Sequence, residues 1–168
     1  FSFTNKVIGL VLTFLLFLNT AYSSPVNQNG ALTISKGQLV NQHNQAISLA
    51  GPSLFWSNTG WGGEQFYNKE VVTQISQQWQ ASIIRAAMGA DNKGSYLTDP
   101  KANLARVEMV IAAAVENDIY VIVDWHSHHA ENNTDQAIEF FQTIAKKYGH
   151  LDNILYEIYN EPLPTTDW

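Results

Sequence analysis

The sequence contains no cysteine and few basic residues, and both shortages limit what the protein can do. The absence of cysteine excludes disulfide bonds and thiolate metal sites, although it assigns no compartment. Only 9 Lys and Arg stand against 15 Asp and Glu, so the formal net charge is -6 at pH 7. No run of basic residues occurs. We therefore expect neither nucleic acid nor an anionic membrane surface among the partners of the protein.

Long apolar runs are also scarce, and the longest lies at the N-terminus. Lys6 precedes residues 7–18, a run shorter than the roughly 20 residues that are needed to cross a bilayer. Ala21 and Ser23 are small residues with the spacing of a signal-peptide cleavage site. We predict a signal peptide over residues 1–23, a secreted, extracellular protein and no membrane contact after cleavage. An uncleaved anchor is the alternative.

The length of 168 residues favours one domain, and a hydrophobic content of 45% is sufficient for a sizeable core. Residues 24–30 are polar and include a proline, so we expect a linker there. Residues 31–168 are the predicted folded unit. It opens with short alternating segments around Lys36-Gly37, which predict a β-hairpin, and continues into a predicted strand over residues 47–50.

Four short apolar runs recur about 35 residues apart, which is the length of one strand-helix unit. They are AISLAG, SIIRAAM, DIYVIVDWH and NILYEIYNEP. The segments between them carry apolar residues at helical spacing, and Asn68 and Thr134 are predicted N-caps. The predicted buried helix faces consist of Val71, Ile75 and Trp79, of Leu104, Val107, Ile111 and Ala114, and of Ala137, Phe141, Ile144 and Tyr148.

Alternating helices and continuously apolar strands predict an α/β fold in which helices cover a parallel sheet. Two architectures compete, an open doubly wound sheet and a closed (β/α)8 TIM barrel. The first strand is followed by GPSLFWSNTGWGG, whose glycines do not match the GxGxxG phosphate fingerprint, and no helical pattern follows at once. This weighs against a dinucleotide-binding sheet. The absence of a Gly-x-Ser-x-Gly elbow disfavours a serine hydrolase on an open sheet.

Polar and aromatic residues follow the predicted strand ends, where both architectures build their sites. We expect a positive, a titratable, an amide and a carboxylate group to converge on one rim, with indoles beside them. The first strand leads into Trp56 and Trp61, the second ends at Arg85, the third ends in Asp124, Trp125 and His126 before His128 and His129, and the fourth ends in Asn160 and Glu161.

Each of these residues also has a structural interpretation. Arg85 could be an ion-pair partner, His126 a hydrogen-bonded core residue and Asp124 an orienting neighbour, and the indoles could belong to the core. Glu157 shares strand parity with Glu161 and is better interpreted as a buried, paired structural carboxylate than as a second catalyst. The histidines lack the helical i, i+4 spacing of common zinc sites, so we expect neither a metal nor another cofactor.

Three motifs, IIRAAMG, IYVIVDWHSH and LYEIYNEP, occur in the order and at the spacing of a barrel. They resemble the second strand, the third strand and the Asn-Glu-Pro signature of glycoside hydrolase family 5, a member of the clan of retaining barrel glycosidases. LVNQHNQAISLAGPSLFWSN is similar to the opening segment of that family. The resemblance covers nearly all of the chain after the predicted cleavage site, which makes it more specific than the Asn-Glu-Pro triplet alone.

The resemblance implies a (β/α)8 barrel that hydrolyses β-1,4-linked glucans with retention, so a β-glucan polysaccharide is the expected partner. Carried over motif by motif, Glu161 corresponds to the general acid/base and Asn160 to the residue that hydrogen-bonds the sugar 2-hydroxyl. His126 corresponds to the active-site histidine of the third strand, and Arg85 to the arginine that keeps the nucleophile ionised. The residues expected to bind substrate are Trp56, Trp61, Trp125 and His128.

Retaining hydrolysis needs two carboxyl groups about 5 to 5.5 Å apart, one as acid/base and one as nucleophile. Apolar surroundings from Tyr159 and Pro162 would help Glu161 to keep its proton. The resemblance puts the nucleophile after a seventh strand, whereas Glu161 closes the fourth predicted unit. We therefore interpret the chain as the N-terminal half of a truncated barrel, inactive by itself and monomeric when full length. Phe55 stands where relatives often carry a histidine.

Two other functions stay open. Substrate choice on such a barrel depends on its rim loops, so a β-mannanase or another β-glycanase is the nearest alternative. A carbohydrate-binding barrel that has lost catalysis is the alternative from another class, and the intact Asn160-Glu161 pair argues against it.

Overall fold

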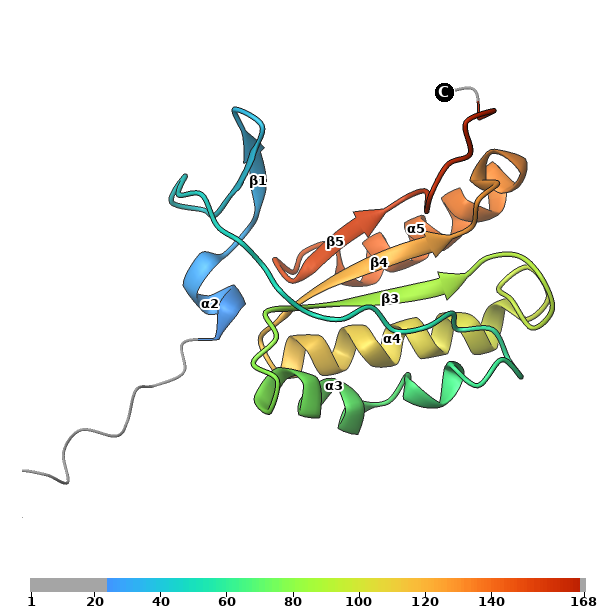
Figure 1. The fold of residues 1–168 in the computed structure, drawn as a ribbon, viewed down its shortest axis with the longest axis horizontal. Coiled ribbons are helices and arrows are strands. Elements are labelled where there is room, and N and C mark those ends of the chain that lie inside the picture. Colours follow the sequence, from blue (N-terminus) through green and yellow to red (C-terminus); the bar gives the residue numbers. More distant parts are fainter. Residues whose placement is uncertain (1–23, 167–168) are drawn as a thin grey trace, which may run out of the picture.

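The computed structural model describes residues 24–166, which form two sheets and the helices that accompany them (Figure 1). The predicted signal peptide lies outside the described residues. No helix within them is long and apolar enough to cross a membrane. The strands are β1 (Thr33–Ser35) and β2 (Gln38–Val40), which pair antiparallel, and β3 (Ile83–Gly89), β4 (Tyr120–His126) and β5 (Ile154–Glu157), which form a parallel sheet in that order. The helices are α2 (Pro25–Asn29), α3 (Lys69–Gln77), α4 (Pro100–Glu116) and α5 (Thr134–Tyr148), with 3-10 turns η1 (Glu64–Phe66) and η2 (Ala130–Asn133).

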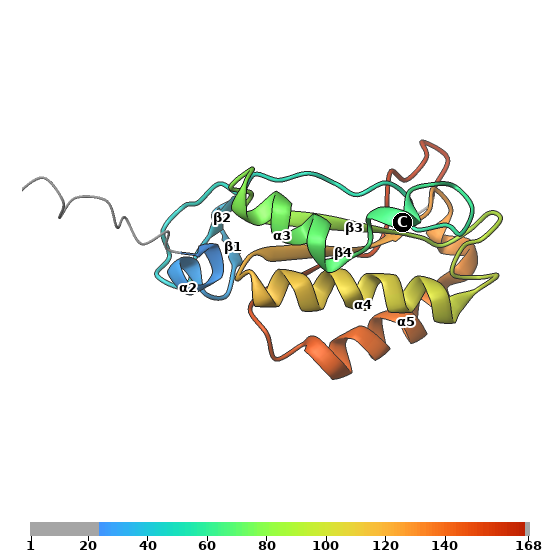
Figure 2. The same cartoon turned by 90° about the horizontal axis from the view of Figure 1, so that it is seen from below.

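Within the described residues, helices cover only one face of the parallel sheet. Helices α3, α4 and α5 lie side by side, as the view from below shows (Figure 2). The register pairs Ile83 with Tyr120 and Val121 with Ile154, so consecutive strands are direct neighbours. A doubly wound sheet carries helices on both faces, whereas a barrel keeps its helices outside. The arrangement therefore favours a section of barrel wall.

A further extended stretch of chain runs parallel to β3. The backbone N–H of Leu54 donates to the carbonyl of Arg85 at 2.9 Å. Gly51 passes so close to β3 that a Cβ at this position would lie 1.6 Å from the carbonyl oxygen of Ile83. The strand predicted over residues 47–50 is therefore placed too early, because only Ala50 of that range bonds to this part of the chain, through Ser82, and the bridge to β3 lies at Ser53 and Arg85.

The N-terminal segment differs from the expected linker. Residues 24–30 contain α2, which begins with Pro25 in its first turn and ends before Gly30, whose φ is 62°. Val26 is buried, and its backbone N–H donates to the carbonyl of Asp118 at 3.1 Å, just before β4. A helix of five residues is too short to produce a periodic apolar pattern.

The predicted hairpin is confirmed. Lys36 and Gly37 form its turn with φ values of 52° and 76°, the positive values that a tight two-residue hairpin turn requires. The N-cap prediction for α3 is also confirmed, because the Asn68 side chain accepts a backbone N–H of the first turn at 2.9 Å. Helix α5 starts at Thr134, so its N-cap is Asn133 rather than the predicted threonine.

The hydrophobic core fills the space between the parallel sheet and its three helices. Because side chains alternate along a strand, the residues on either side of a core residue point to the opposite face of the sheet. That opposite face carries the polar side chains discussed next. The largest fully buried aliphatic and aromatic core residues include Ile84, Met88, Val107, Ile111, Val121, Phe140 and Ile144.

Candidate active site

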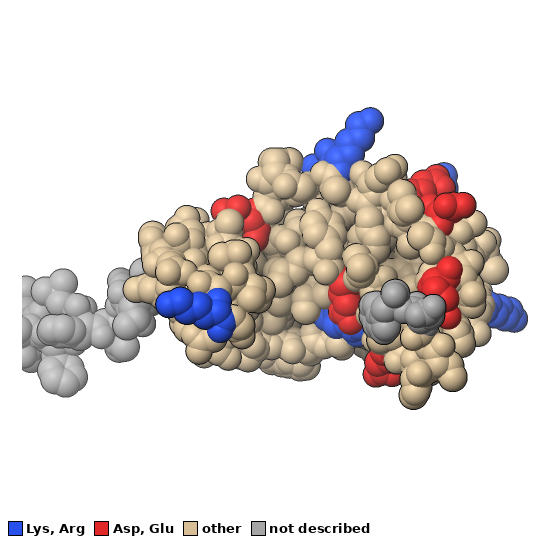
Figure 3. Space-filling model, turned by 90° about the horizontal axis from the view of Figure 1, so that it is seen from above, with Lys and Arg blue, Asp and Glu red and all other residues tan. Residues whose placement is uncertain are grey.

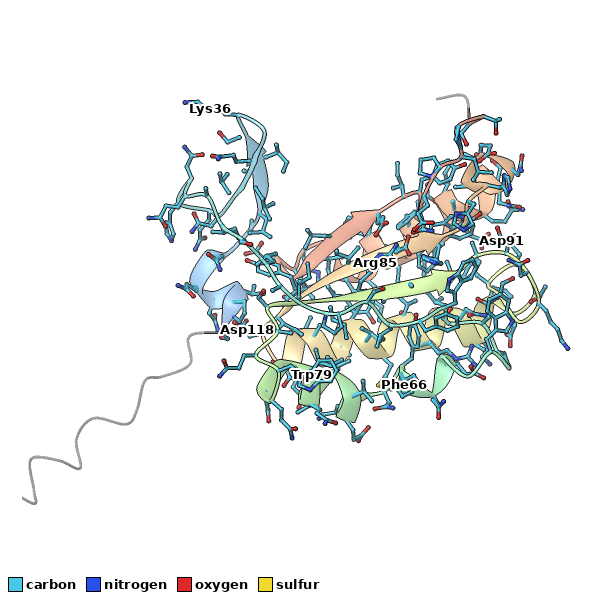
Figure 4. All side chains as sticks on the ribbon, in the orientation of Figure 1. Lys36, Phe66, Trp79, Arg85, Asp91 and Asp118 are labelled. Atoms are coloured by element: carbon cyan, nitrogen blue, oxygen red, sulfur yellow. The ribbon has the colours of Figure 1, made fainter. Side chains whose placement is uncertain are left out.

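Arg85 lies in the middle of β3 and belongs to the sheet face that the helices leave open (Figure 4). Its neighbours Ile84 and Ala86 are fully buried on the helix side. The prediction that the second strand ends at Arg85 is therefore wrong. The strand continues to Gly89, because alternate residues after the arginine still pack into the core.

The Arg85 guanidinium connects side chains from separate strands. Its Nε and Nη2 atoms donate to the two carboxylate oxygens of Glu157 at 2.7 and 2.9 Å, which is a bidentate pair. Nη2 also lies 2.8 Å from Oδ2 of Asp124 and donates to Oδ1 of Asn160 at 2.9 Å. Burial acts to lower the pKa of Arg85, but the bond to Glu157 and the charge of Asp124 outweigh it and raise the pKa. The guanidinium is therefore charged and held in one orientation.

Asp124 has no exposed surface and links Arg85 to His126. Its Oδ2 atom lies 2.6 Å from Nδ1 of His126, whereas Oδ1 has no hydrogen-bond partner among the described residues. Burial raises the pKa of Asp124 above its ordinary value, and the hydrogen bond of His126 and the charge of Arg85 oppose this rise. We call Arg85, Asp124, His126, Glu157 and Asn160 the ionic cluster.

Trp56 and Trp61 stand beside the ionic cluster and form an aromatic wall. Trp56 meets the His126 ring edge to face, with centroids 4.3 Å apart and an angle of 87° between the planes. Trp61 stacks on Trp56 at 5.4 Å and is 40% exposed. Seen from above, acidic surface predominates over basic surface at the end of the molecule where the strands terminate (Figure 3). The wall thus offers exposed indole surface beside His126.

Trp125 does not belong to this wall, which corrects its assignment to substrate binding. The side chain is fully buried on the helix side, where its ring lies 5.5 Å from Tyr96 and 5.7 Å from Phe140. The cause is the alternation of β4, which sends Trp125 to the face opposite that of Asp124 and His126. A ligand on the open face therefore cannot touch it.

Asn160 is buried and completes the ionic cluster. Its side-chain oxygen accepts a hydrogen bond from Arg85, but its Nδ2 atom is a buried donor without a partner in the described part of the chain. An unsatisfied buried donor is costly. The position of Nδ2 therefore favours a bound acceptor such as a hydroxyl oxygen.

Glu161 lies at the rim, outside the ionic cluster. Strand β5 ends at Glu157, so Asn160 and Glu161 belong to the following loop and not to the strand end, contrary to prediction. The Glu161 side chain is 77% exposed, and its Oε2 atom lies 3.8 Å from Nδ1 of His128. Its φ of 46° is uncommon for a residue other than glycine. The apolar surroundings that we expected are not formed around this carboxylate by residues 24–166.

The structure thus brings Arg85, His126 and Asn160 together with Asp124, which we predicted at the same rim, and with Glu157, which we interpreted as a paired structural carboxylate. Glu157 pairs with Arg85, in line with its structural interpretation, although it is only partly buried. Asp124 lies opposite Glu157 in the β4–β5 register. Strand parity accounts for this grouping, because Asp124 and His126 are two residues apart and share one face.

A separate apolar groove of about 610 Å³ runs along α5, away from the ionic cluster. Ile138 and Phe141 of α5 line one side, and Tyr156 and Ile158 line the other. Ile158 is 67% exposed. No member of the ionic cluster lines the groove, so it belongs to the outer edge of the sheet and not to the candidate site.

Comparison with known proteins identifies the family that carries these motifs. A family model described as cellulase (glycosyl hydrolase family 5) matches residues 40–168. This chain belongs to glycosyl hydrolase family 5. Among the relatives of this chain, Endoglucanase Z of Dickeya dadantii is 54% identical over 127 residues, a match that covers 76% of this chain and 30% of that protein. An endoglucanase of Clostridium saccharobutylicum is 33% identical over the whole chain, with 38% of its own length covered.

Solved structures extend the family 5 match to the fold. The catalytic domain of an endoglucanase from Thermobifida fusca superposes with a TM-score of 0.78 at 30% identity, and the match covers 85% of this chain and 47% of that domain. A second structure of that domain contains cellotetraose. A structure from Cytophaga hutchinsonii matches with a TM-score of 0.81 at 42% identity, covering 86% of this chain and 46% of that one. The fold is therefore part of a TIM barrel, and the chain spans less than half the length of these relatives.

Proposed function

We propose that this chain is the N-terminal half of a secreted endo-β-1,4-glucanase that hydrolyses internal bonds of cellulose or related β-glucans with retention. The observation that supports this most is the ionic cluster, which gathers Arg85, His126 and Asn160 beside the indoles Trp56 and Trp61. Sequence similarity adds support, because the chain is 54% identical to Endoglucanase Z over 127 residues.

In the proposed mechanism, Glu161 protonates the glycosidic oxygen of the leaving sugar and then removes a proton from the attacking water. The nucleophile is a carboxylate supplied by residues beyond position 168, about 5 to 5.5 Å from Glu161 in the closed barrel. Arg85 keeps that nucleophile ionised, because a neighbouring positive charge favours the charged form of a carboxyl group. Asn160 donates its free Nδ2 hydrogen to the sugar 2-hydroxyl beside the reacting carbon.

The proposed substrate lies across the rim at the C-terminal ends of the strands, above the inner face of the barrel. Trp56 and Trp61 offer their indole faces to the apolar face of a sugar ring, and His128 stands beside Glu161 at the rim. A neutral polysaccharide fits this place, since it carries no phosphate or carboxylate that an acidic rim would repel. Trp125 is left out of the binding set because of its burial.

The extended stretch next to β3 is proposed to be the first of the eight barrel strands, and β3, β4 and β5 the next three. The groove along α5 then receives the following helix of the same protein, because contiguous exposed apolar surface marks an unformed contact. By the same argument, the 168-residue chain is expected to be poorly soluble and inactive without its continuation. Signal-peptide cleavage after Ser23 would release a full-length monomer that has no membrane contact.

The decisive experiment compares the full-length protein, which includes the residues that follow position 168, with its Glu161→Gln variant. We expect the wild type to release reducing sugar from carboxymethyl-cellulose and the variant to lose nearly all of this activity. Glu139→Gln is the matched control, because Glu139 is exposed on α5, which covers the face of the sheet opposite the ionic cluster. Normal turnover by Glu161→Gln would refute the assignment. Parallel assays on mannan and xylan distinguish a glucanase from a mannanase or another glycanase.

A further inference from the structure

We propose that Asp124 is a positioning residue that holds His126 as the Nδ1–H tautomer and turns the other ring nitrogen, Nε2, toward the bound ligand. The contacts of Asp124 with His126 and Arg85 support the tautomer assignment. Its effect on catalysis rests on the proposed glucanase function. The family match assigns no role to Asp124, and the sequence suggested only that it orients a neighbouring side chain.

The proton between Asp124 and His126 belongs to the imidazole. An ionised carboxylate only accepts hydrogen bonds, so the 2.6 Å contact between Oδ2 and Nδ1 requires a hydrogen on Nδ1. Arg85 places its Nη2 atom 2.8 Å from the same oxygen, and a positive charge there favours the ionised carboxylate. Nη2 also lies 3.4 Å from Nδ1, which is too long to compete with the carboxylate for that nitrogen.

The His126 ring is held on a second side as well. Trp56 packs against it edge to face at 4.3 Å, and the histidine is 8% exposed. With Nδ1 committed to Asp124, Nε2 is the ring nitrogen that has no protein partner within residues 24–166. In the neutral Nδ1–H tautomer, Nε2 is an acceptor, which suits a sugar hydroxyl donor.

The complete burial of Asp124 argues for this role. A buried carboxylate is tolerated only when it is paired, and both partners of this one, Arg85 and His126, carry predicted functions on the open face. One oxygen, Oδ2, makes both contacts. Loss of the carboxylate would therefore free the imidazole to adopt either tautomer and would release one restraint on the guanidinium.

The tautomer is measured by nitrogen-15 NMR of histidine side chains in the full-length protein. We expect a predominant Nδ1–H form for His126 in the wild type. Asp124→Ala should abolish that predominance, and Asp124→Asn, which keeps an acceptor oxygen, should restore part of it. Glu157→Gln is the matched control, because it weakens the Arg85 pair without touching His126, and the tautomer should persist. A wild-type His126 that carries its hydrogen on Nε2 overturns the proposal, even if no variant folds.

Kinetics separate positioning from simple stabilisation. For folded Asp124→Ala, checked by circular dichroism, we expect kcat to fall on the order of 10- to 100-fold, as happens when the outer partner of a metal-bound histidine is lost. KM should change much less. Unchanged kcat in a folded variant overturns the positioning role. An inactive wild-type enzyme with the expected tautomer would instead refute the proposed glucanase function and leave the structural part standing.

Discussion

On β4, Val123 and Trp125 point into the core, whereas their neighbours Asp124 and His126 stand on the opposite face of the same strand. The helix-covered face is held by apolar burial, which depends on shape and volume. The open face is held by charge-assisted hydrogen bonds around Arg85, which depend on the direction of each donor.

Alternate residues of one strand therefore serve different ends, stability on the helix-covered face and the proposed activity on the open face. A substitution on the helix-covered face should lower the free energy of unfolding. A substitution on the open face that keeps the charge but alters the hydrogen-bond geometry should lower activity and leave the free energy of unfolding nearly unchanged. All tests below use the full-length protein, so that both faces are in their complete surroundings.

The largest expected effect is on the helix-covered face. Phe140 is fully buried against Trp125 and Tyr96, with ring centroids 5.7 and 5.3 Å away. Phe140→Ala should lower the free energy of unfolding by about 3–5 kcal/mol, because it removes buried apolar surface and leaves a cavity. Urea unfolding followed by tryptophan fluorescence measures the change. Phe66→Ala is the control, since Phe66 is 47% exposed, and equal losses in both variants would contradict the assignment of the core.

The next effect tests the open face. Arg85→Lys keeps the positive charge but loses the bidentate geometry toward Glu157 and the bond to Asn160. We expect kcat/KM on a soluble cello-oligosaccharide to fall about 100-fold, or roughly 2.7 kcal/mol, with a small change in Tm. Arg106→Lys is the control, because Arg106 donates a single bond to a backbone carbonyl. If Arg85→Lys instead lowered Tm strongly, the arginine would belong to the structural residues.

A smaller effect is expected from the aromatic wall. Trp61→Ala should raise KM about tenfold, or roughly 1.4 kcal/mol, because the outer indole of the wall is lost while the ionic cluster stays intact. Trp79→Ala is the matched control. Contrary to the predicted helix face, Trp79 lies two residues beyond the end of α3 and is 64% exposed, beside the helix layer (Figure 4). Steady-state kinetics on cello-oligosaccharides of increasing length give the comparison. A similar rise in KM for both variants would remove Trp61 from the substrate path.

Much of the fold could be predicted from the sequence, because apolar periodicity reports directly which residues are buried. The parallel strands, their helices and the hairpin at Lys36-Gly37 follow from local patterns and turn chemistry. The predicted face of α5 was incomplete, since Phe140 is fully buried beside the expected Ile144. Two adjacent aromatic residues, Phe140 and Phe141, leave the helical phase ambiguous until the packing partners are known.

The candidate site was less predictable, because motifs identify residues without giving their directions. Strand alternation alone would have excluded Trp125 from substrate binding. The 77% exposure of the Glu161 side chain depends on which distant segments of the chain pack against it. Such long-range contacts have no local signature in the sequence.

The smallest expected effect concerns the start of β4, where a side chain on the same face as Asp124 is covered by other residues. Tyr120 shares strand parity with Asp124, yet it is buried, and its hydroxyl donates to the carbonyl of Gly30 at 2.6 Å. Tyr120→Phe should cost about 1 kcal/mol of unfolding free energy at neutral pH, because one buried hydrogen bond is lost.

The pH dependence of that difference sharpens the test. Burial raises the pKa of Tyr120 from 10.0 to about 12, so between these values the unfolded chain loses the hydroxyl proton while the folded protein retains it. The stabilisation by Tyr120 is therefore complete below pH 10 and decreases as pH rises toward 12. Urea unfolding at pH 8, 10 and 11 should show the wild type losing its advantage over Tyr120→Phe. A constant difference would mean that the hydroxyl is open to solvent and that the two faces are alike at this end.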